Sequence, residues 1–430
     1  MPRTEATGRP RATRPPAALS AQAVKTGAKT ATRAASKAAA TAVERPRQTV
    51  LVLQGGGALG AYQAGVYAAL HEGGIEPDWV IGTSIGAINA AIIAGNEPGE
   101  RLARLESFWQ QVEQASHGLG VAGPWEAMTR GVGPAWLSMW NQAWSSSLAN
   151  ARTVVQGIPP FFTPNPQAWL GLHAQLGVEQ AAWYQTTPLR HTLGALVDFK
   201  RLAQGKMRLT VGAVNVRSGQ MHYFDSRDRR LAVDHIMASG ALPPAFPAVR
   251  IDGEPYWDGG VYSNTPIEAV LDDKPRRDSL IFAINLWPPG GPEPESIWQV
   301  MGRSKDIQYA SRADSHIARQ QQIHRLRHVI RELAREVRPE RADAPEVKSL
   351  ADWGCGTTMH VVRLLAPRLD GEDHTKDIDF TAAGIRARWQ AGYADASAAL
   401  ARGAWREPCD PIDGVVVHEA PPRARAPRAP

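Results

Sequence analysis

The sequence predicts an α/β fold in which a parallel sheet lies between two layers of helices. Two apolar runs, Thr49–Leu53 and Val80–Gly82, each pass at once into a glycine-containing turn and then a helix-compatible stretch. That order, repeated after a short interval, is typical of βαβ units, whose strands lie side by side in parallel. A third apolar run, Ser279–Leu286, supplies another buried strand. We therefore expect a three-layer α/β/α domain.

The first turn, Gly55–Gly60, admits two interpretations. Its glycines satisfy the G-x-G-x-x-G pattern of dinucleotide sites, but those sites also need an acidic residue at the end of the second strand. The nearby acids, Glu76 and Asp78, precede that strand, so the nucleotide interpretation fails. The alternative is an oxyanion hole, in which backbone N–H groups stabilise the oxygen of a tetrahedral intermediate. Its expected donors are Gly55, Gly56, Gly57 and Ile85.

The second turn, Gly82-Thr83-Ser84-Ile85-Gly86, has the Gly-x-Ser-x-Gly form of a nucleophile elbow. A serine at the apex of so tight a turn needs neighbours without Cβ, because the backbone is strained and the next helix passes close by. The N-terminus of that helix also stabilises negative charge beside the hydroxyl. These features predict that Ser84 is a nucleophile.

Four motifs, taken in order, resemble those of the patatin-like phospholipase family. They are Gly55–Gly60, Gly82–Gly86, Ala238–Pro247 and Asp258–Gly260, spread over about residues 48–290. The resemblance implies a patatin-like sheet, a dyad of Ser84 and Asp258 without a catalytic histidine, and hydrolysis of acyl esters of lipids or phospholipids. It also implies supporting roles for Gly60, Gly82, Gly86, Gly259 and Gly260. No metal or organic cofactor is required by this chemistry.

The chain departs from the family at Leu59, where many members carry Lys or Arg. If a cationic side chain helps to stabilise the oxyanion in those members, it has no counterpart at this position. Backbone amides would then have to hold the oxyanion by themselves.

Asp258 follows the apolar pair Tyr256-Trp257 and precedes two glycines, which suits a carboxylate at the end of a strand. As a base it would take the Ser84 proton and pass it to the leaving group. A free carboxylate has a pKa near ~4 and is a weak base, so this role needs a dry site that raises the pKa. From spacing alone, Asp258 could instead be a turn or cap residue. Three other aspartates stay candidates on the same ground: Asp225, Asp234 and Asp252.

A conventional Ser-His-Asp triad is the alternative mechanism. In α/β-hydrolase order its histidine comes late in the chain, and the candidates are His316, His324, His328, His360, His374 and His418. Of these, His374 alone lies on an obvious loop. The earlier His235 is expected in a helix. Ser239 has no elbow sequence, so we expect it to give structural support.

Positive charge is concentrated at the start of the chain. Residues 1–47 hold ten Lys or Arg and two Asp or Glu, a balance of +8, which leaves 38 basic and 40 acidic residues, or −2, for the rest. The nearly neutral remainder argues against specific nucleic-acid binding. The arm is too poor in large apolar residues to form a core, so we expect it to be disordered. It is either a solvated tail or a polycationic arm that contacts nucleic acid, an anionic membrane or the surface of a polymer granule.

The rest of the chain divides into segments of different composition. We expect a catalytic domain over residues 48–290, a helical carboxyl-terminal extension over 296–405 and a disordered tail over 406–430. Within the extension, His360–Leu365 is a candidate strand. An insertion over residues 97–200 is rich in tryptophan: Trp109, Trp125, Trp136, Trp140, Trp144, Trp169 and Trp183. Indoles suit a lipid interface, so the insertion is either a lid or docking surface, or a helical subdomain with a tryptophan core.

Two cysteines, Cys355 and Cys409, are too few for a disulfide framework and favour a reducing compartment. No apolar stretch approaches the roughly 18 residues that span a bilayer. We expect a cytoplasmic protein, or one peripheral at a membrane or storage granule, with a lipid or membrane surface as substrate. The alternatives are a hydrolase of polyesters or thioesters at a granule surface, and a membrane- or granule-binding protein with a vestigial site. The oligomeric state is not predicted.

Overall fold

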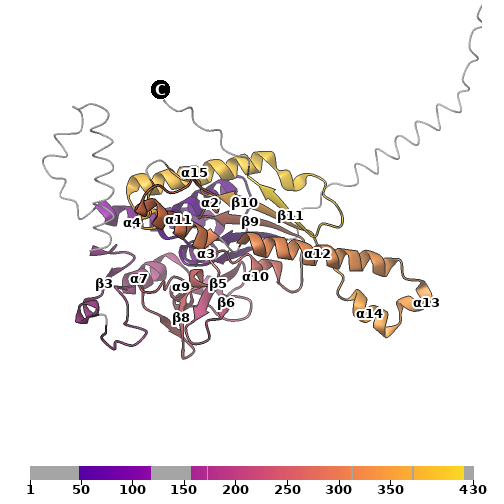
Figure 1. Ribbon diagram of the computed structural model, residues 1–430, viewed down its shortest axis with the longest axis horizontal. Helices are drawn as coiled ribbons and strands as arrows, with labels where there is room; N and C mark the ends of the chain where they lie inside the picture. The colour runs from indigo at the N-terminus through magenta and orange to yellow at the C-terminus, as the bar shows by residue number, and fades with distance from the viewer. Residues whose placement is uncertain (1–47, 118–155, 172, 311–312, 370–371, 421–430) are drawn as a thin grey trace, which may run out of the picture. The chain divides into compact units, whose positions relative to one another are not determined.

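The computed structural model describes residues 48–117, 156–171, 173–310, 313–369 and 372–420. These ranges fall within one compact unit, Pro46–Pro430. A mixed sheet of nine strands forms its centre (Figure 1). The strand order is β11 (Val415–Glu419), β10 (Met359–Leu365), β9 (Ser279–Asn285), β1 (Gln48–Leu53), β2 (Trp79–Gly82), β5 (Arg208–Asn215), β8 (Glu254–Asp258) and β7 (Val249–Ile251), with β6 (Met221–Asp225) paired to β5.

The strands from β11 to β5 run parallel, whereas β6, β7 and β8 pair in antiparallel fashion. Residues alternate across each strand, and this alternation separates two apolar layers. Leu51 and Leu53 face a core that includes residues of α2 (Ala61–Glu72), α3 (Ile85–Ala94), α4 (Pro98–His117) and α15 (Ala382–Arg402). Val50 and Val52 face the other core, with residues of α10 (Glu268–Leu271) and α12 (Ala313–Arg335). The predicted three-layer α/β/α architecture is confirmed.

Shorter elements connect these layers. They are η1 (Gly57–Gly60), β3 (Thr163–Pro164), η2 (Pro166–Leu170), β4 (Tyr184–Gln185), α7 (Thr187–Leu196), α8 (Phe199–Leu202), α9 (Val233–Ser239), η3 (Gly259–Val261), α11 (Ile297–Ala310), α13 (Pro339–Ala342), α14 (Pro345–Ala351), η4 (Lys376–Ile378) and η5 (Ala404–Arg406). Figure 1 shows α12 extending away from the sheet, with α13 and α14 at its far end. No helix of the described ranges is both long and apolar enough to cross a bilayer.

The carboxyl-terminal extension contains the candidate strand His360–Leu365 as β10, but its last part differs from the expectation of a disordered tail. Its strand β10 pairs with β9 of the preceding domain, and β11 pairs in parallel with β10. β11 lies inside the segment 406–430 that was expected to be disordered. The run Val415-Val416-Val417 is too short to signal a strand alone, and pairing with β10 supplies the hydrogen bonds that stabilise it. The extension therefore completes the same sheet.

Part of the tryptophan-rich insertion belongs to the core. α4 opens the segment and buries Trp109, whose indole N–H donates to Asn89 Oδ1 at 3.2 Å. For this residue the core interpretation holds and the lid interpretation is wrong. Trp183 is exposed. Trp125, Trp136, Trp140 and Trp144 lie outside the described residues, and the side chain of Trp169 is likewise not described.

Candidate active site

Ser84 lies at the sharp turn between β2 and α3, where its φ is +56° and its ψ is −127°. Residues with a Cβ rarely adopt this conformation, so the turn is strained. A Cβ on Gly82 would come within 2.3 Å of the Gly86 carbonyl oxygen, and one on Gly86 within 2.3 Å of the Leu53 carbonyl oxygen. Both contacts are with backbone, which cannot move aside. The glycines at these two positions therefore permit the elbow.

Ser239 supports this turn by hydrogen bonding to the backbone of Ser84. The Ser84 N–H donates to the Ser239 carbonyl oxygen at 3.1 Å and lies 3.2 Å from the Ser239 Oγ. The Ser239 hydroxyl in turn donates to the carbonyl oxygen of Gly212 in β5, at 2.6 Å. The expected structural role of Ser239 is confirmed, because its hydroxyl is engaged within the fold.

Asp258 ends β8 and is buried, with 1% of its surface exposed. Its Oδ1 accepts a hydrogen bond of 2.7 Å from the Gly260 N–H, while its Oδ2 has no partner of good geometry among the described residues. Burial raises the pKa of Asp258 from 3.8 to about 7, against the opposing effects of the Ser84 hydroxyl and the Gly260 amide, which favour the ionised form. The absence of a well-formed hydrogen bond between Ser84 and Asp258 Oδ2 is consistent with a catalytic pair, because such bonds are often long when no substrate is bound. The carboxyl group of Asp258 is thus shielded from water and lines the same cavity as Ser84.

The glycine loop after β1 is fixed from both sides. The Gly55 N–H donates to the Asn264 carbonyl oxygen at 3.1 Å. The Gly55 carbonyl oxygen accepts from the Asn264 amide at 3.0 Å and from the Trp287 indole at 2.8 Å. The Gly55 N–H is therefore in use. Among the described residues, no acceptor is found for the N–H groups of Gly56, Gly57 and Ile85, the last of which begins α3 and has no partner within the helix.

A cavity of about 150 Å³ brings most of the expected site residues together. Its lining includes Gly55, Gly56, Gly57, Ser84, Ile85, Asp258 and Gly260. The remaining motif glycines lie behind the wall: a Cβ on Gly60 would come within 2.5 Å of the Ile85 side chain, and one on Gly259 within 2.6 Å of the Gly212 carbonyl oxygen. The far wall is apolar and largely aromatic, with Phe161, Phe162, Tyr184, Phe246 and Phe380 among its residues. An apolar chain therefore fits opposite the polar groups.

The alternative catalytic residues lie elsewhere in the described structure. No histidine lines this cavity. His324 and His328 are buried on α12, His360 and His418 stack on each other between β10 and β11, and His374 stacks on Trp298. Asp225, Asp234 and Asp252 form ion pairs with Arg208, Arg190 and Arg229 respectively. Within the described ranges, no group of three or more His, Cys, Asp or Glu is placed to hold a metal ion.

Comparison with known families agrees with this geometry. The model of the family described as "Patatin-like phospholipase" matches residues 51–271, just over half of the chain. The chain belongs to the patatin-like phospholipase family. A second family model, described as "Patatin phospholipase", matches residues 307–412, so the extension is also characteristic of such proteins. The predicted family is confirmed.

Individual relatives match more distantly. Lysophospholipase nte1 of Aspergillus terreus is 56% identical over 48 residues, which cover 11% of this chain and 3% of that protein. VipD of Legionella pneumophila is 14% identical, with a TM-score of 0.31, over 80% of this chain and 67% of that one. ExoU in its complex with SpcU, from Pseudomonas aeruginosa, is 18% identical, with a TM-score of 0.27, over 72% and 59%. These scores are low, so the fold assignment depends on this chain's own sheet topology.

In this patatin-like phospholipase, the carboxyl-terminal extension forms one side of the cavity. Tyr309 of α11, together with Asp377, Ile378 and Phe380, lines it. The carbonyl oxygen of Asp377 lies so close to the glycine loop that a Cβ on Gly57 would come within 2.2 Å of it. Gly57 has a φ of +56°, which also favours glycine. The glycine at this position lets the extension close over the loop.

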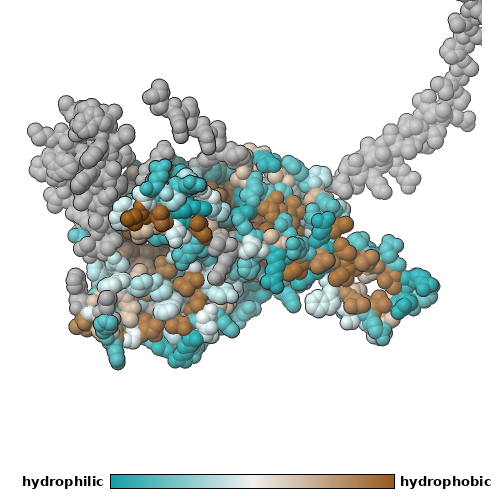
Figure 2. Space-filling view, viewed as in Figure 1, coloured by the Kyte–Doolittle hydropathy of each residue, from teal (hydrophilic) through white to brown (hydrophobic). Residues whose placement is uncertain are grey.

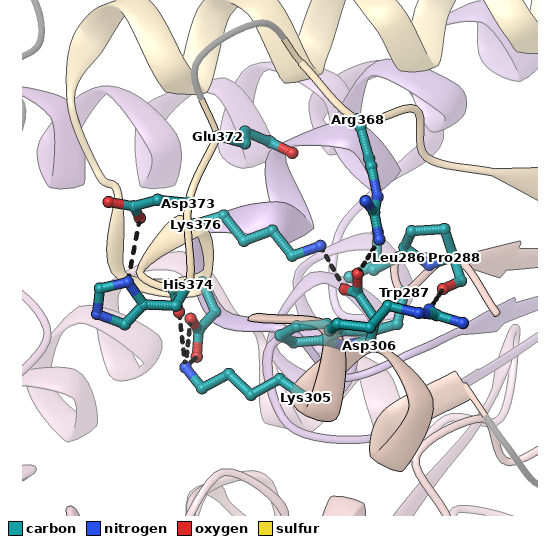
Figure 3. Close-up of polar contacts among 12 residues, drawn as sticks. Leu286, Trp287, Pro288, Lys305, Asp306, Arg368, Glu372, Asp373, His374 and Lys376 are labelled. Carbon is teal, nitrogen blue, oxygen red and sulfur yellow. Dashed lines mark hydrogen bonds and ion pairs between the residues drawn. The ribbon is translucent and has the colours of Figure 1, made fainter. Parts of the chain in front are cut away.

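Ion pairs join two parts of the extension, α11 and the segment around η4, and the pair of Lys376 with Asp306 is buried (Figure 3). Lys376 Nζ lies 2.6 Å from Asp306 Oδ1, and Arg368 contacts the other oxygen of the same carboxylate. Lys305 Nζ lies 2.8 Å from Asp377 Oδ1. Because each buried charge has a partner, these contacts fix α11 to the segment around η4 without leaving an uncompensated charge.

Two residues that fix the glycine loop, Asn264 and Trp287, belong to no motif recognised in the sequence. Asn264 lies four residues after Gly260 of the Asp-Gly-Gly motif, and Trp287 lies two residues after the end of β9, which is next to β1 in the sheet. Trp287 lies near the loop after β1 because β9 is next to β1 in the sheet. This neighbourhood could be predicted only if the strand order were known.

We expect Trp287→Phe to lower kcat for a soluble ester by roughly tenfold with little change in KM. The substitution keeps an aromatic ring but removes the indole N–H that fixes the Gly55 carbonyl oxygen, so the neighbouring amides lose alignment. Steady-state kinetics measure the effect. Trp405→Phe is the matched control, because Trp405 is a buried tryptophan that packs edge to face on Phe282 and does not line the cavity. An equal kcat loss in both variants would show a general packing cost instead of a positioning role.

Proposed function

We propose that this protein is a serine acyl hydrolase that cleaves lipid or phospholipid esters through an acyl-Ser84 intermediate, with Asp258 as base and then acid. One observation carries the proposal. A serine held at a positive φ faces the same apolar cavity as a fully buried carboxyl group whose pKa lies near neutrality. A pKa close to the working pH is what a general base requires.

In the first half-reaction, Ser84 Oγ attacks the ester carbonyl carbon while its proton passes to Asp258. The carbonyl oxygen becomes an oxyanion, for which the N–H groups of Gly56, Gly57 and Ile85 are the proposed donors. The sequence analysis also expected the Gly55 N–H to be a donor to the oxyanion. It is not among the proposed donors, because it already donates to the Asn264 carbonyl oxygen. The intermediate collapses by breaking the bond to the leaving alcohol, whose oxygen takes the proton from Asp258.

In the second half-reaction, water attacks the acyl-Ser84 carbonyl carbon and its proton passes to Asp258. Collapse releases the fatty acid and returns the proton to Ser84 Oγ. Leu59, which stands where many members of the family have a cation, is 3% exposed and lies in the core. The oxyanion is therefore held by backbone amides and by the N-terminus of α3, which carries a partial positive charge.

A fluorophosphonate probe tests the proposal directly, because it modifies only an activated serine. We expect labelling of the full-length wild-type protein, with the added mass on the peptide that contains Ser84. Release of p-nitrophenol from a short-chain ester should accompany it and should be blocked by prior labelling. A folded protein that neither reacts with the probe nor hydrolyses the ester would overturn the proposal, as would labelling at another serine.

A further inference from the structure

The amphipathic pattern of α11 is reversed. Its one acidic residue, Asp306, is 2% exposed, whereas Ile297 is 80% exposed and Ile307 is 50% exposed. Val300 and Met301 are also among the exposed residues. At 100° per residue, Ile297, Val300 and Met301 lie about 120–180° around the helix from Asp306, and Ile307 lies about 100° from it. A helix on a globular protein ordinarily turns its apolar side inward.

The inner side of α11 explains how this arrangement stays folded. Asp306 pairs with Lys376, and Lys305 pairs with Asp377, so ion pairs attach the helix where apolar packing would ordinarily do so. Tyr309 on the same helix lines the cavity and lies against Trp287, with ring centroids 4.9 Å apart. The helix is therefore a wall of the candidate active site that shows its apolar side to the outside.

Exposed apolar side chains also lie beside the cavity near Gly260. Gly260 lines the cavity, and the next two residues, Val261 and Tyr262, are each 50% exposed. Figure 2 shows hydrophobic side chains gathered over α11. Trp298, which is exposed and stacks on His374 with ring centroids 4.4 Å apart, adds an indole at the start of the helix. Indoles combine an apolar ring with a polar N–H and suit the boundary of a bilayer.

We propose that the exposed side of α11, together with Val261 and Tyr262, is the surface by which this protein docks onto a phospholipid interface. This inference rests on the proposed function, because an enzyme that hydrolyses membrane lipids must bring its cavity into contact with the lipid surface. The occupant is lipid because both walls that carry exposed apolar residues also bound the cavity that contains Ser84. A single acyl chain could then leave the bilayer and enter the cavity without crossing water.

The charges on α11 indicate whether docking depends on anionic lipid. The two cations of the helix are turned to partners in the protein: Lys305 to Asp377, and Arg303 to the carbonyl oxygens of Pro288 and Pro289. Exposed Glu293 and Glu295 precede the helix. Docking is therefore apolar insertion, and it should not require anionic lipid or weaken with salt. Binding by the basic arm, residues 1–47, would instead need anionic lipid and be salt-sensitive.

Flotation with phosphatidylcholine vesicles tests this surface. Full-length Ser84→Ala protein binds without hydrolysing the vesicles, and we expect its binding to persist at high salt. Adding Ile297→Ser, Val300→Ser and Ile307→Ser should weaken binding about tenfold or more, because three apolar side chains no longer insert. The same three substitutions in the wild-type background should leave hydrolysis of a soluble ester within about twofold, since none of the three lines the cavity.

The chain offers a matched control on its protruding arm. Leu326, Leu333 and Leu350 on α12 and α14 are also highly exposed, and none of them lines the cavity. Their replacement by serine should leave vesicle binding unchanged. If the triple α11 variant aggregates, Ile297→Ser alone should change binding in the same direction, because this side chain is the most exposed.

Several results would overturn the proposal. They are absence of vesicle binding by Ser84→Ala, undiminished binding by the α11 variant, and equal loss in the arm control. A change from dimer to monomer in the α11 variant, with vesicle binding retained, would show that a second copy of the chain covers this face. Because binding is measured without turnover, its failure is distinct from failure of the probe reaction that tests the proposed function.

Discussion

Replacing Ser84 with alanine is expected to lower kcat/KM for a soluble short-chain ester by at least about 10⁴-fold. The hydroxyl is the only group proposed to bond to the acyl carbon, so its loss removes the covalent route and leaves only what the oxyanion donors and the cavity supply to attack by water. Fluorophosphonate labelling should disappear as well. Initial rates, measured at an enzyme concentration high enough to detect residual turnover, give the size of the effect.

The matched control is Ser239→Ala, which changes the serine that supports the elbow. It removes the hydroxyl that lies 3.2 Å from the Ser84 N–H but leaves the backbone hydrogen bond to that amide. We expect at most about a tenfold loss of rate and continued labelling. A Ser84→Ala variant that retained more than a small fraction of the wild-type rate would contradict the assignment, and a comparable loss in both variants would show damage to the elbow instead.

Ser84→Gly separates the catalytic role from the conformational strain. Glycine adopts a φ of +56° without a Cβ penalty, so this variant should be as inactive as Ser84→Ala but more stable than it in a thermal melt. The gain expected from relief of backbone strain is of order 1 kcal/mol. Such an outcome would mean that the strained backbone at residue 84 costs stability but places the Ser84 hydroxyl for catalysis.

Local sequence predicted the parts of the site that a single turn determines. The elbow around Ser84 and the loop of Gly55–Gly60 could be predicted because tight turns restrict residue type. At the elbow, an added Cβ would come within 2.3 Å of a backbone oxygen at both Gly82 and Gly86. The same reasoning placed Asp258 at a strand end. These predictions depend on interactions within a few residues or between adjacent strands.

Features that depend on distant segments could not be predicted in this way. Asp377 contacts Gly57 across more than 300 residues of sequence, and β11 forms only because β10 offers it an edge. α11 lies in the segment that was expected to be helical, but periodicity shows only which residues share a face and not which face is covered. Its reversed orientation depends on the partners of Asp306, which the sequence does not place.

Asp258→Asn is expected to lower kcat/KM at pH 8 by at least about 10³-fold, because an amide cannot accept the Ser84 proton. In the wild type, burial raises the pKa of Asp258 to about 7, and only the ionised form is a base. The kcat/KM of the wild type should therefore rise with pH through about 7 and level off above it. The pH profile of the free enzyme reports this group, measured with an ester that does not titrate in the range.

The same substitution should stabilise the protein at high pH. Because the pKa of Asp258 is about 7 when folded and 3.8 ordinarily, the folded state binds more protons than the unfolded state between about pH 4 and 7. Its contribution to the free energy of unfolding thus falls as pH rises through that window. Asparagine has no such titration, so Asp258→Asn should exceed the wild type by roughly 2–4 kcal/mol at pH 8, with the difference vanishing near pH 4.

Denaturant unfolding of both proteins at several pH values measures this difference. Asp252→Asn is the control, since Asp252 is exposed and its pKa is lowered by a hydrogen bond from Arg229 instead of raised by burial. It should keep wild-type activity and show no gain in stability at high pH. An Asp258→Asn protein that is inactive yet no more stable than the wild type at pH 8 would mean that Asp258 is not a dry, reluctantly ionised carboxyl group. The rise of kcat/KM with pH would then have to be assigned to another group.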